Sequence, residues 1–234
     1  MTVSPLHVSR SYTKSLPPQL SPHLTFWRSL VSSNDFANKR DLKTFLSEFR
    51  PDINPITSFG LVSIDSGINN QLPAGAGTFA NAGIQYVIGL ATGVSVELIS
   101  TGTLISDDEL TTFKDQANFL VSQTILPQTI VHGYTELESD TSPQLAESIC
   151  NAYAQLAARG VSYIVDTGIW GAGGSPFNSQ CIQWDPPFPA TCPFVTAVGA
   201  TQFFSTDVDE SATSFSGGGF SNIFKRPKYQ DTVV

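Results

Sequence analysis

The 234-residue sequence has few basic residues, few histidines and cysteines, and no long apolar run. Its 12 Lys and Arg against 20 Asp and Glu give a formal net charge of −8. This balance excludes nucleic acid and anionic membranes as expected partners, because both bind clustered Lys and Arg. No run of about 18 apolar residues is present to span a membrane. Pairs of Cys or His at zinc spacing are also missing, so the sequence predicts no metal site.

The shortage of histidine limits the catalytic chemistry that the sequence offers. His7 and His23 lie in a Pro-rich N-terminal region, so a Ser-His-Asp triad would have to use His132. No nucleophile-elbow motif accompanies His132, and we expect it to end a strand with its imidazole satisfied locally. The acidic run 107–109 is interpreted as a helix cap, and the glycines of 168–175 as a tight turn without a phosphate-binding motif.

Three cysteines cannot all pair with one another. Cys181 and Cys192 flank a Pro-rich loop, so we expect them to form a disulfide in an oxidising compartment. Cys150 lies inside a predicted helix and is expected to be a buried, inert thiol.

The segment 142–174 gives the clearest local structure in the chain. Ser142 is a suitable helix N-cap, and Gly160 stands where a left-handed C-terminal residue is favoured. The apolar run Val161 to Val165 then predicts a central strand, with a glycine turn at its carboxyl end. Sites in open parallel sheets form at that end of the strands.

Strand and helix patterns alternate through most of the chain, which predicts one α/β domain with a mainly parallel sheet. A first arm over residues 1–33 is rich in proline and is expected to be extended or disordered. The domain itself is expected over residues 34–234. The periodicities predict helices near 39–50, 78–91, 106–121 and 142–159, and strands near 58–64, 94–100, 128–134, 161–165 and 194–199. The helix near 78–91 is apolar on most sides, so we expect it to be buried.

Several separate stretches resemble the sedolisins, the serine-carboxyl peptidases of peptidase family S53, and especially the secreted fungal tripeptidyl peptidases. The resemblance covers about Asn34 to Asp231. It rests on DFANKRDLKTFLSEFRPDI, ANAGIQYVIGLATGV, CNAYAQLAARGVS, FPATCPFVTAVGATQ and FSGGGFSNIFKRPKYQ, which keep the family's order and spacing. The resemblance implies a subtilisin-like three-layer fold with a mainly parallel sheet, here truncated at the C-terminus.

The resemblance also implies which catalytic groups are missing. The family motif Glu-Ala-Asn-Leu-Asp-x-Gln-Tyr carries a general-base Glu and a supporting Asp, and Phe79 and Gly83 stand at those two positions. The family's oxyanion-stabilising Asp corresponds to Ile169, which cannot donate a hydrogen bond to developing negative charge. The nucleophilic Ser of the Gly-Thr-Ser motif and the family's calcium site would follow Val234.

The resemblance implies substrate-binding residues only at Gly133, Tyr134 and Thr135. They correspond to a strand end that lines the family's substrate cleft. A plain strand end is the alternative interpretation of these residues.

The sequence therefore predicts a catalytically inactive sedolisin homologue, either a pseudoenzyme or a fragment, without a cofactor. One alternative is the N-terminal portion of an active secreted peptidase whose Ser-bearing part lies elsewhere. Another is a non-catalytic protein that binds peptides or unfolded protein. The resemblance implies an extracellular location, although Met1 to Ser15 lacks the apolar core of a signal peptide.

Overall fold

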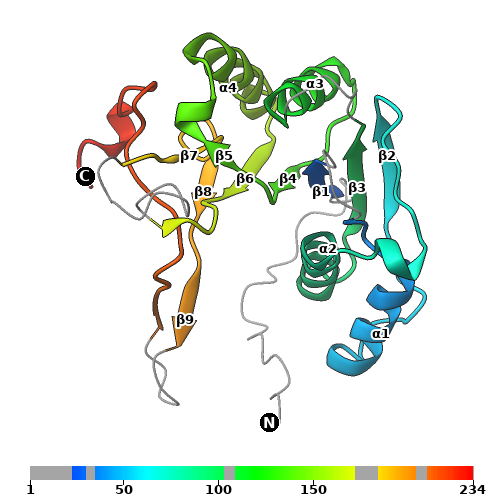
Figure 1. Cartoon of the computed structure of the whole chain (residues 1–234). Helices are drawn as coiled ribbons and strands as arrows, with labels where there is room; N and C mark the ends of the chain where they lie inside the picture. Colours follow the sequence, from blue (N-terminus) through cyan, green and yellow to red (C-terminus); the bar gives the residue numbers. More distant parts are fainter. Residues whose placement is uncertain (1–22, 30–34, 103–108, 172–183, 204–209, 234) are drawn as a thin grey trace. The chain divides into compact units, whose positions relative to one another are not determined.

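The computed structural model describes residues 23–29, 35–102, 109–171, 184–203 and 210–233 (Figure 1). The chain divides into two compact units, Met1–Gly102 and Thr103–Val234. Each unit holds strands and helices in alternation, and each is described by itself below.

The first unit combines three parallel strands with two helices. Strand β3 (Ser95–Thr101) lies between β1 (His23–Ser29) and β2 (Gly60–Ile64), and both pairings are parallel. Helices α1 (Lys39–Phe49) and α2 (Thr78–Leu90) pack on each other. Their inward faces and β3 supply the buried core, which includes Leu42, Leu46, Ile84, Ile88, Val96, Leu98 and Ile99.

The second unit also combines three parallel strands with two helices. Strand β6 (Ser162–Asp166) lies between β4 (Thr129–His132) and β8 (Thr196–Val198), again with parallel pairing. Helices α3 (Glu109–Ser122) and α4 (Pro143–Ala158) lie side by side and contact each other (Figure 1). These findings confirm the mainly parallel α/β fold and the interior position of the Val161–Val165 strand.

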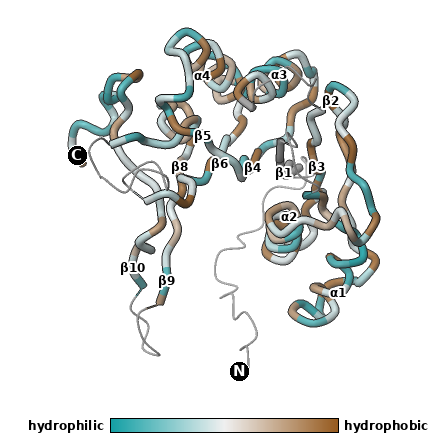
Figure 2. The backbone as a smooth tube through the Cα atoms, in the orientation of Figure 1, coloured by the Kyte–Doolittle hydropathy of each residue, from teal (hydrophilic) through white to brown (hydrophobic). Residues whose placement is uncertain are grey.

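Two short antiparallel pairs complete the second unit. Strand β5 (Glu136–Leu137) pairs with β7 (Pro187–Phe188), and β9 (Thr201–Phe203) pairs with β10 (Glu210–Ala212). Figure 2 shows β9 and β10 running next to each other as a ribbon. One-turn helices follow at Glu138–Asp140 and Lys228–Gln230, and another lies at Pro73–Gly75 in the first unit. The sequence patterns predicted none of these short elements.

The predicted limits of α4 are confirmed by its capping groups. The Ser142 hydroxyl accepts a hydrogen bond from the Leu145 amide at 3.2 Å, and Pro143 occupies the first helical position. Gly160 follows the helix with φ +87°, a conformation that glycine adopts without the steric penalty of a Cβ. Local sequence is sufficient to begin and end this helix.

Two expectations need correction. Residues 23–29, placed in the N-terminal arm, form β1 and pair along their whole length with β3. Helix α2 was expected to be buried on most sides, but Phe79, Tyr86 and Leu90 are exposed because only its opposite face packs on the core. Strand pairing and the choice of a packed face depend on partners far away in the sequence, which periodicity does not identify.

The predicted disulfide between Cys181 and Cys192 is wrong. Cys192 is bonded to Cys150, with Cα atoms 5.7 Å apart and a sequence separation of 42. Both side chains are buried, so Cys150 is a disulfide partner and not an inert thiol. The prediction used proximity along the chain, whereas the fold brings the loop after β7 against α4. Cys181 itself lies outside the described residues.

Candidate functional site

The start of α2 is held by a carboxylate from outside the helix. Gly77 occupies the N-cap position and has no side chain to cap with, and Asp35 accepts a hydrogen bond from the Ala80 amide at 3.2 Å. A Cβ placed on Gly77 would overlap the Asp35 carboxylate. Asp35 is 6% exposed and contributes negative charge at the positive end of the helix dipole.

Asn81 joins the starts of the two helices. Its side-chain oxygen accepts from the Asn38 amide at 2.7 Å, and its side-chain nitrogen donates to Asp41 at 2.8 Å. Asn38 in turn caps α1 by accepting from the amides of Arg40 and Asp41. The side-chain oxygen and nitrogen of Asn81 therefore both help to position the start of α1.

The exposed face of α2 carries no carboxylate. Phe79 is 61% exposed, and Gly83, Tyr86 and Leu90 follow it at positions four, seven and eleven, which share a helical face. The helix, TFANAGIQYVIGL, contains no Asp or Glu. At the two positions where the family resemblance implies carboxylates, the structure presents an exposed aromatic ring and a glycine.

In the second unit, the polar groups gather at the carboxyl ends of β4 and β6. Gly133, Tyr134 and Thr135 follow β4 and are half-buried, and Asp166 is the last residue of β6. The Asp166 carboxylate accepts from the Gly168 amide at 2.8 Å and from the Thr135 hydroxyl at 3.5 Å. Burial raises the pKa of Asp166, while these two hydrogen bonds oppose the rise.

The turn after β6 needs glycine at its centre. Gly168 has φ +69°, and a Cβ on it would lie 2.8 Å from the Thr135 hydroxyl. Ile169 follows with its side chain half-exposed, so the turn offers an apolar group where the resemblance implies an oxyanion donor. The glycine turn predicted here is confirmed at Gly168 and Gly171, while Gly173 and Gly174 lie outside the described residues.

Asp166 was not singled out by the sequence analysis. The available signal was its place directly after an apolar strand and before a glycine turn, the position where parallel sheets build sites. The resemblance drew attention to Ile169, three residues later, because that position matches the family motif.

His132 ends β4, as the sequence predicted, and is completely buried. Its Nδ1 lies 2.9 Å from the Tyr163 hydroxyl, and its ring meets Phe113 edge-on with centroids 4.8 Å apart. Burial lowers the pKa of His132 well below its usual range and raises that of Tyr163. A neutral imidazole enclosed among aromatic rings serves packing and is not accessible to a substrate.

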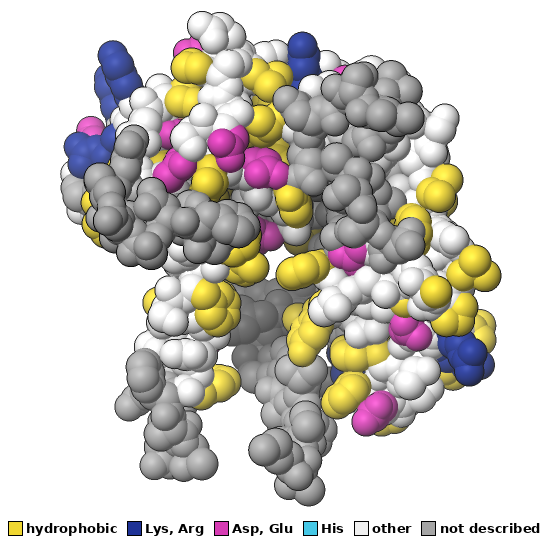
Figure 3. Space-filling view, in the orientation of Figure 1, with side chains coloured by type: hydrophobic (Ala, Val, Ile, Leu, Met, Phe, Trp, Pro, Cys, Tyr) yellow, Lys and Arg dark blue, Asp and Glu magenta, His cyan; other side chains and the backbone are white. Residues whose placement is uncertain are grey.

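Acidic side chains gather on the face of the second unit that Figure 3 turns to the viewer. Burial and the neighbouring charges of Glu136 and Asp185 raise the pKa of Asp140. Tyr134 donates to Glu136 at 2.9 Å, so this acidic group borders the end of β4. Among the described residues, no three His, Cys, Asp or Glu lie close enough to hold a metal ion. No helix within those residues is long and apolar enough to cross a membrane.

Comparison with curated proteins identifies fungal relatives. The chain is 36% identical to Tripeptidyl-peptidase SED2 of Arthroderma otae over 217 residues. It is 33% identical to Probable tripeptidyl-peptidase SED3 of Arthroderma benhamiae over 216 residues. Each match covers 86% of this chain but only 36% of the relative, so the chain spans about a third of the length of these proteins. No model of a protein family matches the chain.

Among solved structures, the chain is similar to the serine-carboxyl proteinase sedolisin of Pseudomonas. The TM-score is 0.66 at 21% identity, and the match covers 91% of this chain and 61% of the sedolisin chain. At this identity the similarity shows the fold. It agrees with the subtilisin-like arrangement of parallel strands and helices expected from the sequence.

Proposed function

We propose that this chain, a homologue of the sedolisin-family tripeptidyl-peptidases, does not hydrolyse peptide bonds. The observation that carries the proposal is the exposed face of α2, which presents Phe79 and Gly83 and no carboxylate. These are the two positions at which the family resemblance implies the general-base Glu and its supporting Asp. A phenyl ring and a hydrogen atom can neither accept nor donate a proton, so the base-assisted attack of a serine has no base.

The turn after β6 supports the same proposal. Ile169 stands where the family resemblance implies the acid that would stabilise the oxyanion. Losing one such donor typically costs about a hundredfold to a thousandfold in rate. Asp166 is three residues away, and its Oδ1 accepts hydrogen bonds from the Gly168 amide and the Thr135 hydroxyl. We assign Asp166 to holding the turn together.

A second candidate function is peptide binding without cleavage. Gly133, Tyr134 and Thr135 remain half-buried at the carboxyl end of β4, so backbone and side-chain surface is available to an extended peptide. The acidic residues near this strand end favour peptides with a free amino terminus or basic side chains. The disulfide between Cys150 and Cys192 supports an oxidising, extracellular setting for such a protein.

The test combines turnover and binding in one buffer. The purified chain is assayed at acidic pH with a tripeptide-releasing fluorogenic substrate, with Tripeptidyl-peptidase SED2 of Arthroderma otae as the positive control. We expect no turnover above the blank. A signal that survives repeated purification would overturn the proposal.

Binding of fluorescent peptides is measured in parallel by anisotropy. We expect Tyr134→Ala to weaken binding, and Ile125→Ala, which alters an 87% exposed side chain in the same unit, to leave it unchanged. If the parent chain and Tyr134→Ala bind the peptides with equal affinity, the β4 strand end is not the binding site.

A further inference from the structure

Strand β8 has one unused edge. Among the described residues it pairs only with β6, and Thr196, Ala197 and Val198 are all exposed. The Thr167 amide donates to the Val198 carbonyl at 3.2 Å, so Val198 turns its peptide groups towards β6. Neighbouring residues in a strand direct their peptide groups to opposite sides. Ala197 therefore presents its N–H and C=O groups outward, in the positions that a further strand would use.

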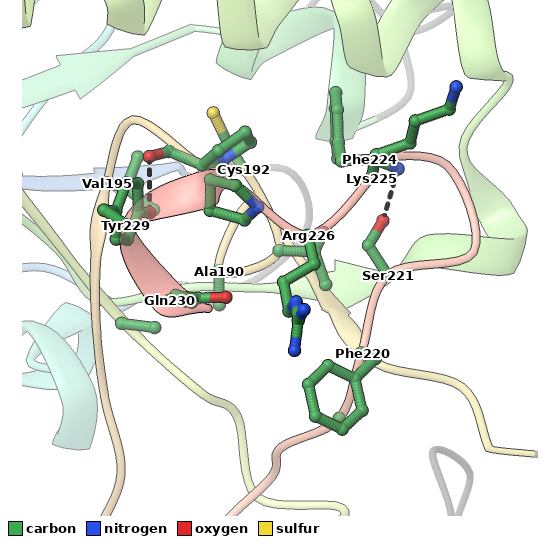
Figure 4. Close-up of a pocket in the computed structure, with 15 residues that line it drawn as sticks. Ala190, Cys192, Val195, Phe220, Ser221, Phe224, Lys225, Arg226, Tyr229 and Gln230 are labelled. Atoms are coloured by element: carbon green, nitrogen blue, oxygen red, sulfur yellow. Dashed lines mark hydrogen bonds between the residues drawn. The ribbon is translucent and has the colours of Figure 1, made fainter. Parts of the chain in front are cut away.

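A pocket of about 310 Å³ lies on one face of β8 (Figure 4). Val195 and Ala197, two residues apart, form its strand side, and the segment 219–230 forms the opposite wall. The lining mixes polar groups with apolar side chains such as Val195 and Phe224. The rim residues Phe220 and Tyr229 are 68% and 66% exposed. Large aromatic side chains left this exposed around a pocket are typical of interaction sites.

The pocket is basic in an otherwise acidic chain. Lys225 and Arg226 line it, and Figure 4 shows Arg226 reaching towards the open middle of the pocket. Arg226 pairs with Asp231 at 2.9 Å, but the two side chains are 42% and 52% exposed. An ion pair this exposed is weak, so a carboxylate from another molecule can replace Asp231.

We propose that the free edge of β8 and this pocket form a docking site for an extended segment of a partner polypeptide. The segment adds to the sheet beside β8, places an apolar side chain in the pocket, and directs a neighbouring carboxylate to Lys225 and Arg226. This site is separate from the β4 strand end considered above and does not depend on it.

Three observations select this occupant. The outward peptide groups of Ala197 match an extended backbone and not a helix, whose peptide groups are bonded internally. The fungal relatives and sedolisin both contain long stretches of polypeptide that this chain does not match, so an occupant from outside these 234 residues fits the fold. The net charge of −8 disfavours a second copy of the chain and favours a partner selected by the local basic group.

The probe is an acetylated, fluorescein-labelled octapeptide of alternating Val and Thr with a central Leu and a neighbouring Asp. The matched control is the same peptide with alternate backbone nitrogens methylated. It keeps the side chains but lacks those backbone hydrogen-bond donors. Anisotropy is measured with the full chain at neutral pH and moderate salt. We expect the methylated peptide to bind at least about tenfold more weakly than the parent peptide.

Two variants locate the site on the protein. Ala197→Pro removes the outward N–H of β8 without removing a bond to β6, and we expect about a tenfold loss of affinity. Lys225→Glu is expected to weaken binding of the Asp-containing peptide but not of its Asn analogue. Lys114→Glu, at an exposed position on α3, is the charge-matched control and leaves affinity unchanged.

Several results would overturn the proposal. These are no binding at about 1 mM peptide, equal binding of the methylated peptide, or equal binding by folded Ala197→Pro. The methylated peptide keeps the test decisive if Ala197→Pro fails to fold. A dimer that forms with concentration in light scattering and disappears in Lys225→Glu would identify a second copy as the occupant, against the partner proposed here. A loss of probe binding in Tyr134→Ala would place the peptide at the β4 strand end.

Discussion

Ser221 donates a hydrogen bond to the buried carboxylate of Glu138 at 2.5 Å, although the two residues are 83 positions apart in sequence. The other oxygen of Glu138 accepts from the Asn222 amide at 2.6 Å. Glu138 is 2% exposed and lies in the one-turn helix after β5. This carboxylate therefore holds the C-terminal segment 219–230 against the rest of the second unit. The same segment forms one wall of the pocket beside β8.

Glu138→Ala is expected to destabilise the protein by about 3 kcal/mol, because hydrogen bonds to a charged group contribute about 1.5–3 kcal/mol and their donors would lose a buried acceptor. Urea denaturation at neutral pH measures the change. The matched control is Glu147→Ala on the exposed face of α4, which should alter stability by no more than about 0.5 kcal/mol. Equal effects of the two substitutions would show that Glu138 does not hold the segment.

Replacing Cys192 with Ala is expected to cost about 3–4 kcal/mol, because the bond to Cys150 closes a loop of 42 residues and restricts the unfolded chain. Peptide mapping without reduction should join the peptides that contain Cys150 and Cys192. Cys181→Ala is the control and should leave thermal stability unchanged. A crosslinked peptide containing Cys181 and Cys192 would contradict the structure and restore the pairing expected from the sequence.

Stability should fall as the pH decreases from 7 to 5 because of His132. Burial lowers the pKa of His132 in the folded protein, whereas a histidine in the unfolded chain has a pKa of about 6.5. Below this pH, His132 binds a proton in the unfolded state but not in the folded state. The free energy of unfolding therefore falls by up to about 1.4 kcal/mol for each pH unit below this value. Asp166, whose pKa is raised, contributes with the opposite sign nearer its own titration.

The check is denaturation of the parent chain and His132→Gln at several pH values in this window. We expect His132→Gln to be less stable at pH 7, because it loses the aromatic packing and the Tyr163 contact, but to show a flatter dependence on pH. Parallel curves for the two proteins would assign the pH dependence to other groups.

Restoring the carboxylates should not restore peptidase activity. The triple variant Phe79→Glu, Gly83→Asp, Ile169→Asp rebuilds the missing charges, but residues 1–234 contain no Gly-Thr-Ser segment to supply the nucleophile. Loss of a catalytic serine costs on the order of a millionfold in rate. Phe79 and Ile169 are half or more exposed, so the variant should fold. Reproducible release of tripeptides by this variant would show that the active site has been misplaced.

The sequence alone determined the elements whose signals are local. In α4, the Ser142 cap, an apolar stripe and Gly160 lie within one turn of where they act, so the helix and the strand after it were predicted closely. The alternation of such units also determined the mainly parallel α/β fold. The replacements at Phe79, Gly83 and Ile169 are likewise visible in the sequence, although their meaning depends on the family resemblance.

Only the tertiary structure decided which distant segments meet. Strand β1 exists because β3 offers a full ladder of hydrogen bonds to residues 23–29, and Cys192 reaches Cys150 because the fold returns the β7 loop to α4. The same holds for Glu138 with Ser221 and for the Asp166 carboxylate with Thr135. Such contacts depend on the packing of whole elements, and short-range patterns of residues carry no information about which elements will pack together.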